Sequence, residues 1–368
     1  MDIMRRRLMS GALGAAALGL PGLGTAQQRP SLKVGMANAN MTVTYPYIST
    51  TLALGMFPEE GVNVEVVHGQ NSPQILGLLV GKAVDVVFCN PEPTIQLVAD
   101  RGANLKSVFV VQVSQYILTA PEGSPVKTVQ DLKGKRLGMA SPVSGIDYLK
   151  ARLQDAGMSV NDIEIVPTGF AGQVIAALQQ KRVDAILYWS DAIAQFRYAG
   201  IKLNDLPKAD WEQGLYQYQA VTRQDVIDQN ADGLRRALRA MARAQMLTVV
   251  SPELTIEAFW KQYPDQAPKP DQRKVAFEQN MARVEAQNKI IGTPPNPTKE
   301  QLMKQRWGEN SLEAWRRMQD NLLRVGSLQN KVDPARFFDN RFIDYANGFD
   351  REKLYQLAAD YKAGKLLK

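Results

Sequence analysis

Glu92 and Asp191 are two carboxylates that the sequence places in equivalent positions, 99 residues apart. Each directly follows an apolar run, in Asn90-Pro91-Glu92 and in Trp189-Ser190-Asp191. Two carboxylates beside an aromatic ring suit an amino-bearing or heteroaromatic ligand, because they accept hydrogen bonds and attract positive charge. The alternative is that each acid lies in the first turn of a helix, where the helix dipole favours negative charge.

Other reactive side chains are scarce. Cys89 is the only cysteine and His68 the only histidine. No disulfide can form within the chain, no Cys/His zinc set exists, and a Ser/His/Asp triad could be built only around His68. Cys89 lies in an apolar run and is expected to be a small buried side chain. We therefore expect no catalytic residue, no metal site and no cofactor.

The equivalence of the two carboxylates comes from an internal duplication. Val34-Gly35-Met36-Ala37 returns as Leu137-Gly138-Met139-Ala140, and the apolar run 84–88 returns as 183–187. Each copy alternates short β-branched runs with amphipathic stretches, which predicts an α/β fold of two β-α-β-α-β lobes with parallel strands. Ligands of such sheets bind outside the carboxyl ends of the strands, so the two lobes should share one cleft.

The predicted elements follow the duplication. In the first copy we expect strands at 32–37, 62–67 and 84–89, and helices at 45–60, 72–81 and 94–100, with Ser72 as N-cap of the second helix. In the second copy we expect a short helix at 128–132, strands at 136–140, 163–167 and 183–189, and helices from 145 to 155, 173 to 181 and 192 to 199.

Two segments are expected to connect the lobes. Residues 105–119 form a long apolar extended run, and the Pro/Gly-rich loop 121–125 that follows is predicted to be the first crossing. The β-prone run 216–222 is predicted to be the return crossing. The remaining residues have helical patterns and should cover the first lobe. The predicted division is 1–26 signal peptide, 27–119 first part of lobe 1, 120–216 lobe 2, and 217–368 return crossing and helical completion of lobe 1.

The residues after the predicted strand ends are the candidates for ligand binding. In the first lobe they are Asn38, Asn40, Thr42, Gln70, Asn71, Ser72, Asn90 and Glu92. In the second lobe they are Ser141, Ser144, Gly145, Thr168, Phe170, Trp189 and Asp191.

Three of these candidates have specific expected roles. Helix starts at Ser72 and Ser144 would offer free backbone N–H groups to an anion, although plain capping explains both residues equally well. Trp189 could stack on a flat ligand, and strand alternation points its neighbour Tyr188 to the opposite face. A tryptophan buried in the core is the alternative. The predicted loops contain no arginine or lysine, which disfavours an anion held mainly by guanidinium.

The N-terminus predicts export. Arg5-Arg6-Arg7 precedes a Gly/Ala/Leu stretch, and small residues at 24–26 suit cleavage after Ala26. The segment fits a twin-arginine or a general secretory signal, and we expect a periplasmic protein. The formal net charge of +7 is spread along helical faces, which gives no support to nucleic-acid binding.

These features together resemble a family of transport proteins. The residues that carry the resemblance are 34–40, 58–65, 81–93, 131–138, 172–191, 338–342 and 347–350. They resemble the solute-binding proteins of nitrate/taurine-type (NitT/TauT) ABC importers, the group that includes thiamine-pyrimidine precursor binders. The resemblance implies a type II periplasmic-binding-protein fold. It also implies a protein that closes by hinge bending on a small ligand and delivers it to a membrane permease. We expect this protein to be a monomer.

Alternative functions stay open at this point. The ligand could be a sulfonate, nitrate or carboxylate bound at helix N-termini. Fungal thiamine-pyrimidine synthases also resemble this family, but those enzymes depend on a cysteine-rich stretch, whereas the sequence here has the single Cys89. A sensory or chaperone module is a third alternative, which the lack of any appended domain disfavours.

Overall fold

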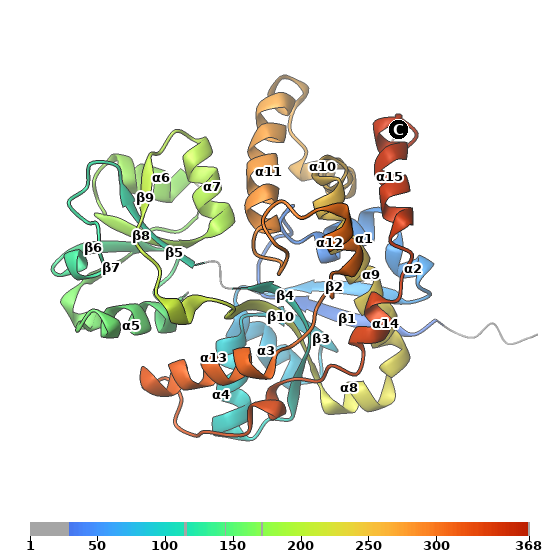
Figure 1. Cartoon of the computed structure of the whole chain (residues 1–368), viewed down its shortest axis with the longest axis horizontal. Helices are drawn as coiled ribbons and strands as arrows, with labels where there is room; N and C mark the ends of the chain where they lie inside the picture. The colour runs from blue at the N-terminus through green and yellow to red at the C-terminus, as the bar shows by residue number, and fades with distance from the viewer. Residues whose placement is uncertain (1–28, 114–115, 144, 171, 367–368) are drawn as a thin grey trace, which may run out of the picture.

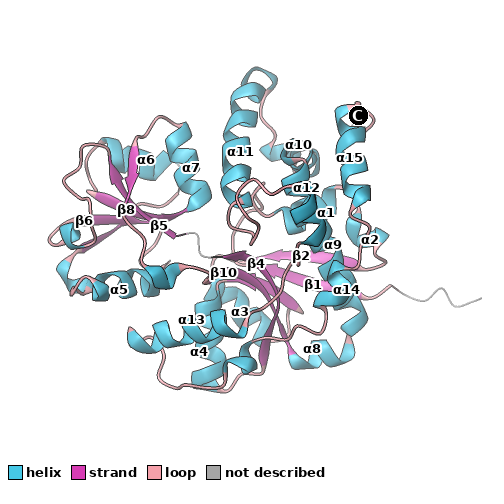
Figure 2. Cartoon of the chain, viewed as in Figure 1, coloured by secondary structure: helices cyan, strands magenta, loops and turns pink. Residues whose placement is uncertain are grey.

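Two five-stranded mixed sheets form the centres of two lobes (Figures 1 and 2). The computed structural model describes residues 29–113, 116–143, 145–170 and 172–366. The first-lobe sheet has the order β2-β1-β3-β10-β4, with β1 Ser31–Met36, β2 Asn63–His68, β3 Val86–Cys89, β4 Leu105–Val113 and β10 Tyr216–Arg223. The second-lobe sheet has the order β7-β6-β8-β5-β9, with β5 Tyr116–Pro121, β6 Arg136–Met139, β7 Glu164–Pro167, β8 Ala185–Trp189 and β9 Leu203–Asp205.

The duplication is visible in the strand pairing. β1 lies parallel between β2 and β3, and β6 lies parallel between β7 and β8. Each sheet then adds an antiparallel strand beside the third strand of its unit, β10 beside β3 and β5 beside β8. The predicted α/β fold is confirmed.

The first passage between the sheets lies earlier than predicted. β5 begins at Tyr116 and pairs with β8 and β9, so the chain changes sheets between Val113 and Tyr116 and not in the loop 121–125. Apolar residues continue on both sides of the passage because both strands are buried, so the sequence shows no break there. The return strand β10 pairs with β3 and β4, as the run 216–222 predicted.

Helices cover both lobes. In the first copy they are α1 Pro46–Ala53, α2 Met56–Glu59, α3 Ser72–Val80 and α4 Pro91–Arg101. In the second copy they are α5 Ile146–Asp155, α6 Gly172–Gln179 and α7 Ser190–Tyr198. The C-terminal third contains α8 Gln224–Gln229, α9 Ala231–Val250, α10 Pro252–Gln262, α11 Arg273–Asn288, α12 Lys299–Lys304, α13 Leu312–Arg324, α14 Ile343–Asn347 and α15 Glu352–Lys362. Short 3-10 helices are found at Gln130–Leu132, Val160–Asp162, Asp210–Glu212, Pro264–Gln266, Pro270–Gln272 and Pro334–Phe337.

Three helices of the first copy differ from the prediction. The helix predicted at 45–60 is broken at Gly55, whose φ of 66° is left-handed and favours glycine. The third helix is capped by Asn71 and not by Ser72, because Asn71 has extended backbone and its side chain accepts the Gln74 N–H. The fourth helix begins at Pro91 and not near Thr94, because proline is tolerated in a first helical turn.

The C-terminal third packs mainly on the first lobe. Side chains of α9, α10, α14 and α15 share a continuous core with α1 and β1. Two of its helices also contact the second lobe, α11 against α7 and α13 against α5 (Figure 1). The C-terminal third therefore faces the second lobe at two places.

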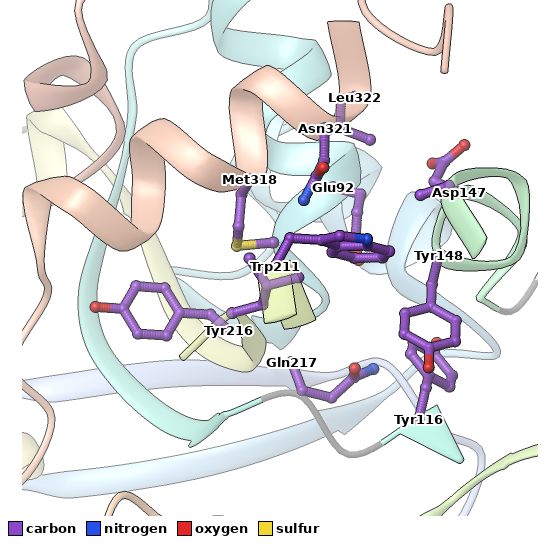
Figure 3. Close-up of a pocket in the computed structure, with 12 residues that line it drawn as sticks. Glu92, Tyr116, Asp147, Tyr148, Trp211, Tyr216, Gln217, Met318, Asn321 and Leu322 are labelled. Atoms are coloured by element: carbon purple, nitrogen blue, oxygen red, sulfur yellow. The ribbon is translucent and has the colours of Figure 1, made fainter. Parts of the chain in front are cut away.

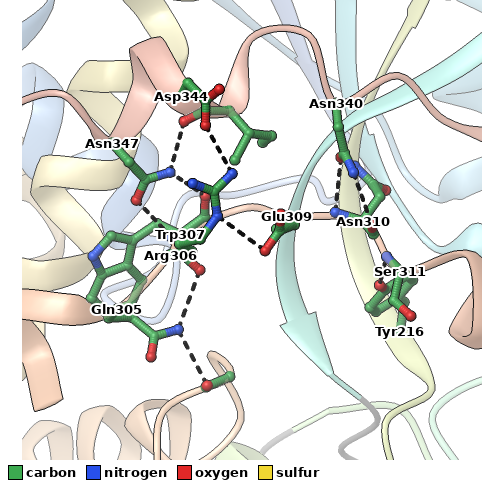
Figure 4. Close-up of polar contacts among 12 residues, drawn as sticks. Tyr216, Gln305, Arg306, Trp307, Glu309, Asn310, Ser311, Asn340, Asp344 and Asn347 are labelled. Carbon is green, nitrogen blue, oxygen red and sulfur yellow. Dashed lines mark hydrogen bonds and ion pairs between the residues drawn. The ribbon is translucent and has the colours of Figure 1, made fainter.

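Asparagine side chains hold the C-terminal segment in place (Figure 4). Asn340 accepts the Asn310 N–H at 3.0 Å and donates to its carbonyl at 2.8 Å, and Asn347 forms the same pair of bonds with Trp307 at 2.8 and 3.0 Å. The next N–H, from Ser311, is donated to the Tyr216 hydroxyl at 2.5 Å. Asn340 and Asn347 thus fix the segment 307–310, and Ser311 connects this segment to β10.

Within the described ranges, no helix is both long and apolar enough to span a bilayer. Among the same residues, no three His, Cys, Asp or Glu side chains gather as a possible metal site. The predicted signal peptide lies outside the described residues.

Candidate functional site

Glu92 and Asp191 lie at matching strand–helix junctions. β3 leads into α4 and β8 leads into α7, and each carboxylate is the second residue of its helix. The N-cap residues Asn90 and Trp189 both have extended backbone, and neither caps its helix with a side-chain hydrogen bond. The 99-residue correspondence is therefore real in three dimensions, and both acids are placed where a helix dipole favours negative charge.

A pocket lies between the lobes beside Glu92 (Figure 3). The first lobe contributes α4, β10 and α13, and the second lobe contributes β5, α5 and the 3-10 helix Asp210–Glu212. The volume is about 40 Å³, a few times the roughly 10 to 15 Å³ that one water needs. The twelve described residues that line it include no lysine or arginine: Glu92, Tyr116, Asp147, Tyr148, Ala151, Trp211, Leu215, Tyr216, Gln217, Met318, Asn321 and Leu322.

Glu92 is half-buried in this pocket. Burial is the main reason that its pKa is raised to about 7, and the nearby Asp147 carboxylate raises it further. Asp147, at the start of α5, has a different environment, because its carboxylate accepts a hydrogen bond from the Ser327 hydroxyl at 2.5 Å and lies 3.6 Å from the Lys150 ammonium. No salt bridge to Glu92 is formed by any residue that the structure describes.

Asp191 has a different environment. It is 5% exposed, and its Oδ2 lies 3.2 Å from a guanidinium nitrogen of Arg283 on α11. Burial raises the pKa of Asp191, while Arg283 and the Thr44 hydroxyl counteract that rise. The prediction that disfavours an anion held mainly by guanidinium rests on the absence of arginine and lysine from the predicted loops. It considered only the strand-end loops, whereas Arg283 comes from a helix of the C-terminal third.

The aromatic residues of the second lobe divide between core and surface. Tyr188 is fully buried and donates a 2.6 Å hydrogen bond to the Gly169 carbonyl. Trp189 is half-buried, and its ring centroid lies 5.9 Å from that of Phe170, which is 63% exposed. Trp189 packs against the same cluster as Tyr188, with ring centroids 5.4 Å apart, so the expected placement of the two rings on opposite faces is wrong. Thr168 is buried and donates to the Met139 carbonyl at 3.0 Å.

The first-lobe candidates form two groups. Ser72 is buried, with its hydroxyl donating to Asn90 Oδ1 at 2.9 Å and accepting the Asn90 N–H at 3.0 Å. Asn90 also donates to the Gln217 carbonyl at 3.2 Å, so this pair connects α3 with β10. Gln70 and Asn71 are exposed at the start of α3.

The second group follows β1. Asn38 donates to the Asn40 carbonyl, while its Oδ1 is buried and has no partner among the described residues. Asn40 is exposed, and the Thr42 hydroxyl lies 2.8 Å from that of Thr44. His68 Nδ1 lies 3.0 Å from the Asn38 carbonyl, which fits a structural role for the single histidine.

The remaining candidates precede α5. Ser141 and Gly145 are half-buried, and Ser144 lies outside the described residues. Gly145 is the N-cap of α5, with a left-handed φ of 77°. A Cβ at this position would lie 2.8 Å from the Tyr116 ring, so glycine lets α5 approach the wall of the pocket.

Cys89 is a buried thiol, as predicted. Burial raises its pKa to about 12, and its sulfur lies 3.6 Å from the Thr94 hydroxyl. A thiol held in its neutral form is a poor nucleophile.

Several site residues could not be found from the strand-end rule. Tyr116 lies at the start of a strand, Trp211 lies in the 3-10 helix Asp210–Glu212, and Met318 and Arg283 belong to helices outside the duplication. The sequence contains a weak signal for Tyr116 and Tyr216, since both are close to predicted crossings between lobes. It contains none for α11 or α13, whose side chains have no counterpart in either copy.

Comparison with known proteins gives a family and a fold. The sequence model of the family described as NMT1/THI5 like matches residues 46–254, which is 209 of the 368 residues. A binding protein of Brucella abortus is 21% identical over 287 residues, covering 77% of this chain and 83% of that protein. A protein of Escherichia coli named as binding aliphatic sulfonates is 33% identical over 137 residues, covering 36% of this chain and 41% of that protein.

Solved structures share the fold. The periplasmic aliphatic sulphonate binding protein SsuA from Escherichia coli superposes with a TM-score of 0.60 at 19% identity, covering 85% of this chain and 99% of that one. The desulfurization enzyme DszB superposes with a TM-score of 0.56 at 14% identity, covering 86% of this chain and 99% of that one. The fold therefore occurs both in binding proteins and in an enzyme.

Proposed function

This chain belongs to the NMT1/THI5-like family, and from that premise we propose that it is the solute-binding component of a NitT/TauT-type ABC importer. It acts outside the cytoplasm as a monomer, closes by hinge bending on a small polar ligand, and presents the closed form to a membrane permease. The names of its relatives, a binding protein and a periplasmic sulphonate-binding protein, support this role.

The observation that carries the proposal is the pocket lined by both lobes. Glu92 and Gln217 come from the first lobe, and Tyr116 and Tyr148 come from the second. A ligand that contacts both lobes binds the closed form better than the open form, and therefore shifts the population towards closure. The two moving units are the two sheets with their helices, connected between Val113 and Tyr116 and between β9 and β10.

For the ligand we favour an amine-bearing or heteroaromatic molecule. The pocket has the Glu92 and Asp147 carboxylates and several aromatic rings, and no arginine or lysine among its described lining residues. Such a lining attracts positive charge and offers flat surfaces for stacking.

A sulfonate or carboxylate is the second candidate. The relative from Escherichia coli is named for aliphatic sulfonates. Arg283 also brings a guanidinium to the interface between the lobes, beside Asp191 and not beside the Glu92 pocket. Its Nε is buried and has no hydrogen-bond partner in the described part of the chain. That nitrogen could donate to an anion.

Catalysis of the thiamine-pyrimidine synthase type has less support. The thiol nearest the site, Cys89, is buried, and burial holds it in the neutral form. We therefore infer a binding role.

Mass spectrometry of the native protein and a thermal-shift screen would test the proposal. The full chain is expressed with its N-terminal segment, recovered from the periplasm and measured under conditions that retain ligands. We expect a co-purified small molecule, and a rise in Tm with amine-bearing or heteroaromatic compounds. A rise with sulfonates alone would favour the second candidate. Cytoplasmic retention together with no response to any compound would contradict the proposed function.

A further inference from the structure

We propose that the pocket between α4, α5 and α13 binds a protonated amine or amidine group of the ligand, with the Glu92 carboxylate as counter-ion and α13 as a specificity-determining wall. This inference rests on the proposed solute-binding function and locates the charged end of its ligand. It concerns one subsite of the cleft, on the side opposite the Asp191–Arg283 ion pair.

The first observation is the charge of the pocket. Glu92 is half-buried, and no described lysine or arginine forms an ion pair with it. The second carboxylate, Asp147, already has the Ser327 hydroxyl and Lys150 as partners. A half-buried carboxylate without a counter-charge is destabilised, and a cation placed beside it would favour its ionised form. The raised pKa of Glu92 agrees with this situation.

The second observation is the set of rings that surround this carboxylate. The ring centroid of Tyr148 lies 5.3 Å from that of Tyr116 and 5.8 Å from that of Trp211. Tyr148 is fixed by a 2.7 Å hydrogen bond from its hydroxyl to Glu212. Aromatic faces attract ammonium and guanidinium groups within about 6 Å of the ring centroid. Rings held in place and one unpaired carboxylate together suit an organic cation.

Trp211 already binds a cation in the protein. The guanidinium of Arg324 lies 5.4 Å from its ring centroid, and Asp155 pairs with that guanidinium. Arg324 and Asp155 form an ion pair, so their charges neutralise each other, and neither residue lines the pocket. The arrangement leaves Glu92 as the carboxylate that still requires a positive partner.

The third observation is the size of the pocket and the origin of its third wall. A volume of about 40 Å³ suits a terminal group of a few atoms and not a whole metabolite. Met318, Asn321 and Leu322 of α13 form one side of it (Figure 3). Helix α13 lies outside the duplication and outside the matched residues 46–254, so neither copy of the repeated unit supplies this wall.

The test uses simple ammonium ions as probes on the full-length protein. Methylammonium and ethylammonium chlorides are compared with sodium methanesulfonate, at ionic strength matched with sodium chloride, by saturation-transfer NMR and thermal shift. The variants are Glu92→Gln, Trp211→Phe, and Glu164→Gln as a control that removes an exposed carboxylate of β7. We expect methylammonium to bind wild type and Glu164→Gln equally, and to bind Glu92→Gln about tenfold more weakly.

Trp211→Phe keeps an aromatic ring and should weaken binding by a smaller factor, about threefold. This variant provides the test if Glu92→Gln does not fold. A second test is the affinity of wild type for methylammonium, which should rise from pH 6 to pH 8 as Glu92 ionises. Unchanged affinity in both variants, or binding of methanesulfonate in preference to methylammonium, would overturn the amine subsite. A native ligand without an amine would overturn it as well while leaving the solute-binding function intact.

Discussion

Glu92 and Asp191 occupy the same position in two copies of one folding unit but have different surroundings. Asp191 is buried and paired with Arg283, whereas Glu92 faces a pocket without a cationic partner. The backbone and the helix dipole are equivalent at the two sites, so they do not account for the difference. It arises because the C-terminal third places a basic residue of α11 opposite one junction and the apolar and amide side chains of α13 opposite the other. The two copies of the unit therefore differ in charge at the cleft because of the C-terminal third, which is not duplicated.

Removal of Arg283 should give the largest effect, because it makes the Asp191 site resemble the Glu92 site. Arg283→Met leaves a buried carboxylate without its partner, which should cost about 3 kcal/mol in the free energy of unfolding. Urea denaturation measures this cost. Arg197→Met is the matched control, since its ion pair with Asp205 is about 40% exposed on both sides and should be worth less than about 1 kcal/mol. Equal losses in the two variants would show that the Asp191 pair is not special.

Glu92→Gln should change the pH dependence of stability. The pKa of Glu92 is about 7 in the folded protein and has an ordinary value of 4.5, so the folded state binds more protons between these values. Wild type should therefore lose stability as pH rises from about 4.5 to 7, whereas the variant lacks this contribution. We expect the variant to gain about 3 kcal/mol relative to wild type between pH 4.5 and pH 8, measured by urea denaturation. Parallel pH profiles would contradict the raised pKa.

Gly145→Ala tests how closely the second lobe approaches the pocket. The new Cβ would contact the Tyr116 ring at 2.8 Å at a left-handed φ of 77°. Gly157→Ala has a similar φ of 68° and nothing within 4 Å, so it isolates the backbone strain. We expect backbone strain to lower the free energy of unfolding by about 1 kcal/mol in both variants, and the contact with Tyr116 to lower it by about 1 kcal/mol more in Gly145→Ala. Thermal unfolding measures both, and equal losses would show that Tyr116 can move freely.

Phe170→Ala should have the smallest effect on stability. Its side chain is 63% exposed, so we expect a change within about 0.5 kcal/mol. If the Trp189 side of the cleft also contacts the ligand, this variant should weaken binding of the native ligand several-fold by titration calorimetry. Unchanged affinity would assign recognition to the Glu92 side alone.

Local patterns in the sequence establish the repeated unit and its immediate consequences. The 99-residue shift correctly aligned the two junctions because each copy must bury the same strands between the same helices. The apolar run around Cys89 correctly predicted a buried thiol. These are local or periodic properties, and the chain expresses them without reference to distant segments.

Packing between segments that are distant in the sequence determines which side chains lie opposite each junction. Arg283 is 92 residues from Asp191 along the chain, and no periodicity connects the two. The same holds for α13, which reaches Glu92 because the C-terminal third packs on the first lobe and extends towards the second. Whether a carboxylate is paired, and whether its proton is held, depends on the burial and charge that such distant segments supply. The sequence pattern therefore places the two carboxylates at the strand ends. The packing of the C-terminal third, which is not part of the duplication, gives each carboxylate its chemical character.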